Sequence, residues 1–274
     1  MPRPGTIALV LLALAQMASV LGFALRGHVT ASDRFAMPQQ VDLLATLLKP
    51  QIWLAWGLLG AAMAALGAYA ARRLQDGLRA RRARRADTGP ADPPDLPPAA
   101  IGPLTAGSMA RLYDDDQTLA EHAPLLIGLS ASALWPWLIA PLPLAAQLLA
   151  LIAVAGVLSA LLRGRRRAGR ITQSWPLGFF AGWIWLLGSA ALARALQDRT
   201  GTSGTDSAIL AMLTCAGGAF ALQLHLGRRI GFSVAVIWGL IAMAAATVFV
   251  NAAVALVAML CIACIALGLV RATT

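Results

Sequence analysis

Side chains that could carry acid, base or metal chemistry are few and scattered in this sequence. The histidines His28, His122 and His225 lie far apart, and the acidic residues 114–116 and Glu121 precede an apolar segment, where they can cap a helix start. Neither a nucleophile–base–acid order nor a metal-ligand spacing can be assembled from them. The sequence therefore predicts a protein that is not an enzyme, with no catalytic residue and no metal site.

The cysteines offer one further chemical pattern. Cys261 and Cys264 have the CxxC spacing of metal or redox sites, and Cys215 is the third cysteine. All three lie inside apolar stretches, without a nearby histidine or a second pair. Packing of small residues in a helix is therefore favoured over metal binding.

Tryptophan is the informative residue type, with eight tryptophans against two tyrosines. Five lie near the ends of apolar segments, as the aromatic belts of membrane proteins do: Trp53, Trp56, Trp135, Trp137 and Trp175. Trp183, Trp185 and Trp238 instead lie about eight to ten residues inside a segment, or ~12–15 Å deep at the rise of a helix. A buried indole N–H needs a partner. These tryptophans either bond a neighbouring helix or line a cavity for a flat hydrophobic ligand, and Trp183 and Trp185 point ~200° apart.

The amino-acid composition indicates which class of protein carries these residues. Hydrophobic residues make up 59% of the 274 residues, charged residues 12%, and the mean hydropathy is +0.71. Soluble domains carry roughly 25% charged residues. The net charge of +10 comes almost entirely from arginine, clustered between apolar segments and without the soluble scaffold of a nucleic-acid-binding domain. The sequence predicts an integral membrane protein in contact with the lipid bilayer, and no nucleic-acid partner.

Eight apolar segments are long enough to cross a bilayer. Its hydrocarbon core of ~30 Å needs about 20 helical residues, and unpaired backbone groups cannot face lipid. The predicted spans are residues 7–25, 52–71, 124–140, 142–162, 175–195, 208–226, 230–250 and 252–270. The last two form one apolar stretch broken only by Asn251, which predicts a tight hairpin. The fold class is therefore all-α, a polytopic transmembrane bundle of about eight helices.

Basic residues alternate with these spans and predict the orientation of the chain. With both termini in the cytoplasm, all but five of the 22 basic residues lie on the cytoplasmic side, as the positive-inside rule requires. The five on the opposite side are Arg26, Arg34, Lys49, Arg194 and Arg199. Residues 1–25 also resemble a secretory signal peptide, but the apolar run exceeds a usual h-region, so a retained helix is favoured.

The predicted spans and loops divide the chain into three regions. Residues 1–71 form a first transmembrane hairpin with an outward-facing loop at 26–50, residues 72–123 a cytoplasmic linker rich in arginine and proline, and residues 124–274 a six-helix transmembrane region. The basic run 79–85 is expected to continue the second helix, and the ADTGPADPPDLPP stretch after it to be disordered or extended. In the outward loop, Val41, Leu44, Leu47 and Leu48 share one helical face. This predicts a short amphipathic helix at the membrane surface or covering a cavity.

Several segments carry a family resemblance, in this order: SDRF (32–35), AWGLLGAAMAALGAYA (55–70), SASALWPW (130–137), WPLGFFAGWIW (175–185) and VIWGLIAM (236–243). Together they resemble the tryptophan-rich sensory proteins, in particular a longer, divergent TspO-like branch. The sequence departs from the family pattern at Ala191, where an asparagine is expected, and at Gly60, where a tyrosine is expected.

The resemblance implies a non-enzymatic sensor or binding protein for a hydrophobic, tetrapyrrole- or sterol-like ligand, located in the bacterial inner membrane. The candidate ligand contacts are Trp56, Trp135, Trp183 and Trp238. No cofactor is assigned; a tetrapyrrole or a lipid is the implied ligand. Two alternatives stay open: a transporter of a small solute, and a structural or assembly subunit of a larger membrane complex. A homo-oligomer is also compatible with the helices rich in alanine and glycine.

Overall fold

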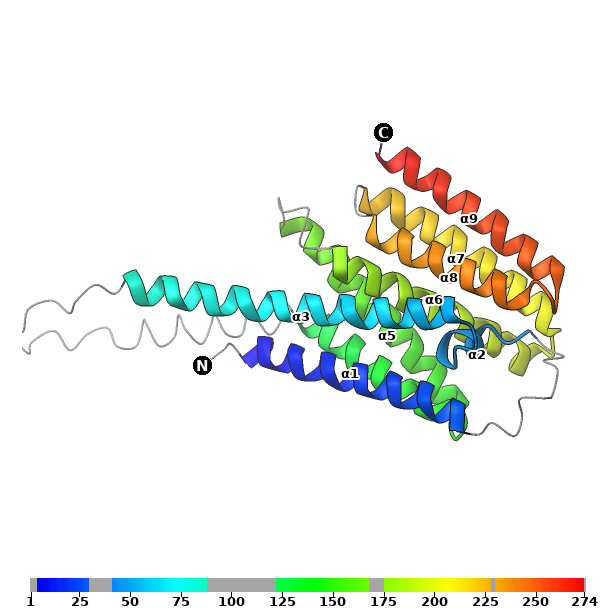
Figure 1. Ribbon diagram of the computed structural model, residues 1–274, viewed down its shortest axis with the longest axis horizontal. Coiled ribbons are helices and arrows are strands. Elements are labelled where there is room, and N and C mark those ends of the chain that lie inside the picture. Colours follow the sequence, from blue (N-terminus) through cyan, green and yellow to red (C-terminus); the bar gives the residue numbers. More distant parts are fainter. Residues whose placement is uncertain (1–3, 30–40, 88–121, 168–174, 228–229, 274) are drawn as a thin grey trace, which may run out of the picture.

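The chain folds into a bundle of long helices with one short helix at an end (Figure 1). The computed structural model describes residues 4–29, 41–87, 122–167, 175–227 and 230–273, and this part of the chain forms nine helices and no strand. In chain order they are α1 (Pro4–Val29), α2 (Leu43–Leu48), α3 (Trp53–Asp87), a helix over residues 122–138, α5 (Pro143–Arg167), α6 (Trp175–Thr200), α7 (Gly204–Leu226), α8 (Gly231–Thr247) and α9 (Ala252–Thr273). The predicted fold class, an all-α polytopic bundle, is confirmed.

The long helices have the length and composition that a bilayer demands. Six of them are apolar over 18 residues or more: α1, α3, α5, α6, α7 and α9. The helix over 122–138 and α8 have 17 residues each, the lower limit of about 17 for crossing a bilayer. The protein is therefore an integral membrane protein, and its outer faces contact lipid.

Helix α6 is the centre of the bundle. In its apolar window 78% of the residues are buried, against 28% in α1 and in α5. It packs against α3, α5, α7 and α8. The peripheral helices instead expose large apolar side chains such as Leu11, Leu148 and Leu260, which only hydrocarbon can solvate favourably.

The predicted hairpin at the end of the chain is present. Helix α8 ends at Thr247, three residues before the predicted end of the seventh span, because residues 248–250 form a turn. Asn251 then begins α9: its side-chain Oδ1 accepts hydrogen bonds from the backbone N–H groups of Ala253 at 3.1 Å and Val254 at 3.4 Å. An asparagine N-cap marks the start of a helix, and a hydropathy profile does not detect it.

Helix α3 continues well beyond the membrane, as the basic run 79–85 predicts. Its 35 residues extend ~52 Å at the helical rise, against a hydrocarbon core of ~30 Å. In Figure 1 it projects past the other helices, at the end of the bundle where α1 begins. Arg72, Arg79 and Arg82, in the second half of α3, are exposed. The proline-rich stretch predicted to be disordered lies outside the described residues.

Candidate functional site: a cavity beneath helix α2

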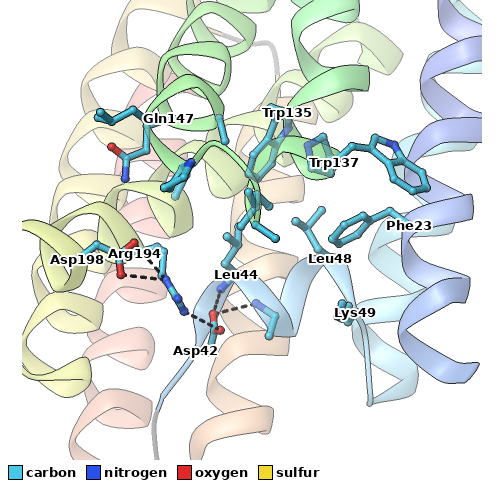
Figure 2. Close-up of a pocket in the computed structure, with 18 of the residues that line it drawn as sticks. Phe23, Asp42, Leu44, Leu48, Lys49, Trp135, Trp137, Gln147, Arg194 and Asp198 are labelled. Carbon is cyan, nitrogen blue, oxygen red and sulfur yellow. Dashed lines mark hydrogen bonds and ion pairs between the residues drawn. The ribbon is translucent and has the colours of Figure 1, made fainter. Parts of the chain in front are cut away.

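A large cavity lies at the end of the bundle that carries α2, and we call it the α2 cavity. Its volume is about 910 Å³, near the upper end of the range of about 300–1,000 Å³ that is usual for small-molecule sites. Residues of α1, α2, α5, α6 and the end of the 122–138 helix surround it (Figure 2). Its apolar lining includes Phe23, Leu44, Leu48, Trp135, Pro136, Trp137, Ile139, Ala140, Pro143, Leu144, Ala146 and Ala191, and its polar lining Arg26, Asp42, Lys49, Gln147, Arg194, Asp198 and Arg199.

Helix α2 is short and owes its form to one cap and one apolar face. The Asp42 carboxylate Oδ1 accepts hydrogen bonds from the backbone N–H groups of Leu44 and Ala45, each at 3.0 Å, so two otherwise unpaired donors are satisfied. Leu43, Leu44, Leu47 and Leu48 are buried. The predicted amphipathic helix is confirmed, and because Leu44 and Leu48 line the α2 cavity, it covers that cavity.

Removing the cap should loosen α2 over the cavity. In Asp42→Ala the amides of Leu44 and Ala45 lose their acceptor, which costs about 1 kcal/mol of helix stability. We expect hydrogen exchange of residues 43–48 to be about fivefold faster than in the unaltered protein. Asp42→Asn keeps an oxygen acceptor and serves as the control; equal exchange in the two variants would show that the cap does not hold α2.

A charged cluster forms one side of the α2 cavity. Arg194 of α6 lies between two carboxylates: its Nε is 3.3 Å from Asp198 Oδ1, and its Nη1 is 3.8 Å from Asp42 Oδ2 (Figure 2). These side chains are 42–49% exposed. Ion pairs this exposed contribute only about 0–1 kcal/mol. The Asp42–Arg194 pair is thus a weak link between α2 and α6, and Arg194 can exchange partners at small cost.

The opposite side of the cavity is aromatic and cationic. The rings of Phe23 and Trp137 meet edge to face, with centroids 5.7 Å apart. Arg26 lies over the Trp137 ring at 4.9 Å, and Lys49 lies over the Phe23 ring at 5.7 Å. The Trp137 indole N–H donates to the Ser19 hydroxyl at 2.8 Å, which fixes the ring against α1. This wall therefore presents aromatic faces and positive charge together.

Of the four tryptophans predicted as ligand contacts, one lines the α2 cavity. Trp135 lines it and is 2% exposed. Trp238 packs elsewhere, its indole N–H donating to the Leu54 carbonyl oxygen at 3.2 Å, and Trp56 is partly buried against the core. Trp183 is fully buried, and its N–H has no partner among the described residues. The structure thus does not bring the four together at one cavity.

The charged residues of the α2 cavity were not predicted as a site. A signal for them exists in the sequence, because Arg26, Lys49, Arg194 and Arg199 are four of the five basic residues that fall on the non-cytoplasmic side of the predicted topology. The fifth, Arg34, lies outside the described residues. Ala191 also lines the cavity, at the position where the family that this sequence resembles is expected to have an asparagine.

The long apolar helices define the class, an integral membrane protein that is a polytopic helical bundle, and this bundle has a cavity at one end. A family model described as TSPO-like protein matches residues 111–271, well over half of the chain, and the chain belongs to this family. No curated protein and no solved structure matches it. Helices α1, α2 and α3 precede the matched region, so residues of α1 and α2, outside that region, form part of the α2 cavity, and residues of the matched region form the rest.

Proposed function

We propose that this TSPO-like protein is a non-enzymatic sensor or binding protein that holds a hydrophobic, tetrapyrrole- or sterol-like ligand in the α2 cavity. The observation that carries the proposal is the cavity itself: about 910 Å³, with a nearly buried tryptophan in its wall. Membership of the TSPO-like family supports a binding or sensing role. Within the described residues no group of three or more His, Cys, Asp or Glu could hold a metal ion.

Trp135 is the proposed aromatic contact. It is followed in the sequence by Pro136 and Trp137, and its indole faces Leu44 and Leu48 across the cavity (Figure 2). Because Trp135 is 2% exposed, a flat ligand can stack on this ring only after neighbouring side chains move aside, and it then gains ~25 cal/mol for each Å² of apolar surface buried. Trp56, Trp183 and Trp238 stay predictions as ligand contacts, and would need a second site because they do not line the α2 cavity.

The proposal includes an orientation in a bacterial inner membrane, with both termini in the cytoplasm. It is supported by the arginines of α3, which lie at the end of the bundle opposite α2, where the predicted cytoplasmic clusters belong (Figure 1). In this orientation the α2 cavity faces the non-cytoplasmic side. A ligand would reach it from outside the cell membrane or from the outer leaflet.

Titration with protoporphyrin IX tests the proposed function. We expect saturable quenching of tryptophan fluorescence in purified protein, and an affinity about tenfold weaker in Trp135→Leu, because a stacked ring contributes roughly 0.5–1.5 kcal/mol beyond its buried area. Trp53→Leu is the matched control, since Trp53 is 78% exposed and does not line the cavity. Quenching that never saturates, or that weakens equally in both variants, would contradict the proposal.

A further inference from the structure

We propose that the ligand of the α2 cavity is an amphipathic anion, with a carboxylate or phosphate group held by Arg194 and Arg199 and an apolar body packed toward Trp135. This rests on the proposed function, because it assigns the chemical class of the ligand in the same cavity. Three features of the lining carry it: its charge balance, its gradient of burial, and the side of the membrane on which its cations lie.

The cavity lining has a surplus of positive charge. It contains the cations Arg26, Lys49, Arg194 and Arg199 against the carboxylates Asp42 and Asp198. Both carboxylates are paired with Arg194 alone. Among the described residues, the other three cations have no carboxylate partner. An anion placed among them would be attracted by several charges at once.

The lining is charged and exposed beside Arg194, and it is most deeply buried at Trp135 and Leu48. The charged groups of the Arg194 cluster are about half exposed and therefore face water. Trp135 and Leu48 are each 2% exposed, whereas Trp137 and Leu144 of the same lining are 38% and 56% exposed, so the protected apolar part of the cavity is the part around Trp135 and Leu48. This division matches a molecule with one charged end and one apolar body. A wholly apolar ligand would leave the cations without a counter-charge.

The position of these cations is costly for membrane topology. Lysine and arginine on non-cytoplasmic connections oppose the positive-inside rule. In the proposed orientation five basic residues lie on that side, and four of them line this one cavity. Arg26 lies in the last turn of α1, Lys49 is the C-cap of α2, and the other two lie in the last two turns of α6. Because these four cations lie together at one cavity although they oppose the positive-inside rule, we infer that they have a role there.

Arg194 can change partners when an anion arrives. Its contact with Asp42 is long, at 3.8 Å, and both side chains are exposed to water. Arg199, five residues further along α6, also lines the cavity and has no ion pair with a described carboxylate. A bound carboxylate or phosphate would accept charge-assisted hydrogen bonds from both guanidinium groups.

The test compares cis-parinaric acid with its methyl ester, which has the same chain without the charge. Energy transfer from tryptophan reports binding to purified full-length protein in a neutral detergent at pH 8. We expect the acid to bind saturably and about tenfold more tightly than the ester, and added salt to weaken only the acid. In Arg194→Gln/Arg199→Gln the preference should fall to about twofold or less.

Two further variants keep the test decisive. Arg72→Gln/Arg79→Gln removes the same charge from the exposed part of α3, and should keep the full preference for the acid. Arg199→Gln alone breaks no ion pair with a described residue and should weaken acid binding about threefold without loss of folded protein. Equal binding of acid and ester, or a preference that survives in Arg194→Gln/Arg199→Gln, would overturn the anion assignment while leaving the binding function intact. If neither parinarate, ester nor protoporphyrin binds saturably, the proposed function itself fails.

A final experiment distinguishes two sources of the anion, a phospholipid headgroup and a free amphiphile. The protein is placed in nanodiscs of phosphatidylglycerol or of phosphatidylcholine before titration with cis-parinaric acid. Weaker parinarate binding in phosphatidylglycerol, after correction for the partitioning of parinarate into protein-free nanodiscs of the same lipid, identifies a phospholipid headgroup as the natural anion. Equal binding in the two nanodiscs identifies a free amphiphile that enters from the aqueous side.

Discussion

Replacing Gly182 by alanine should destabilise the protein more than any other single methyl group added to α6. A Cβ at this position would lie 2.5 Å from the Phe232 carbonyl oxygen and 2.8 Å from the Ala235 Cβ, both on α8. The nearest obstacle is backbone, so α6 and α8 must move apart. Because α6 is the central helix of the bundle, we expect a loss of about 3 kcal/mol and a Tm lower by about 10 °C in detergent.

Gly217→Ala is the matched control for this substitution. Gly217 lies on α7, and no atom is within 4 Å of the position that its Cβ would occupy. Alanine also favours the helix over glycine, so the Tm of this variant should stay unchanged or rise slightly. If Gly182→Ala retained the Tm of the unaltered protein, the close approach of α6 and α8 would not be the contact that holds the centre of the bundle together.

The fold was predictable because the bilayer sets strict rules of length and polarity. Apolar segments of about 20 residues have few alternatives to a spanning helix, and the eight predicted spans correspond to the eight long helices. Errors are confined to helix ends. The seventh span was predicted to reach residue 250, whereas α8 ends at Thr247, because residues of the turn are as apolar as those of the helix.

The cavity was only partly predictable from the sequence. The Arg194–Asp198 contact has the i,i+4 spacing of a helical ion pair and can be recognised without a structure. The contact between Arg194 and Asp42 joins residues about 150 positions apart, so only tertiary packing reveals it. Depth in the membrane follows from counting residues, but lateral position does not. Trp183 and Trp135 therefore both fitted the predicted ligand site, although only Trp135 lines the cavity.

The two glutamines buried in the bundle should respond to the same substitution with opposite signs. Gln16 and Gln223 are each 0% exposed. Gln223 joins α7 to α8: its Oε1 accepts from the Ser233 hydroxyl at 2.6 Å, and its Nε2 donates to the Gly227 carbonyl oxygen at 2.6 Å. The Gln16 amide has no hydrogen-bond partner among the described residues. The Gln223 amide thus forms hydrogen bonds with polar groups of its neighbours, whereas the Gln16 amide is removed from water without gaining a hydrogen bond.

Methionine fills nearly the same volume as glutamine without its polar groups, so it isolates the effect of hydrogen bonding. Gln223→Met should lower the Tm in detergent by a few degrees, because Ser233 and Gly227 lose partners in an apolar interior. Gln16→Met should raise it by a similar amount, since burying an unpaired amide costs about 1 kcal/mol or more. The two variants are measured side by side under identical conditions. A lower Tm for Gln16→Met would mean that the Gln16 amide is satisfied after all, for instance by an ordered water between the helices.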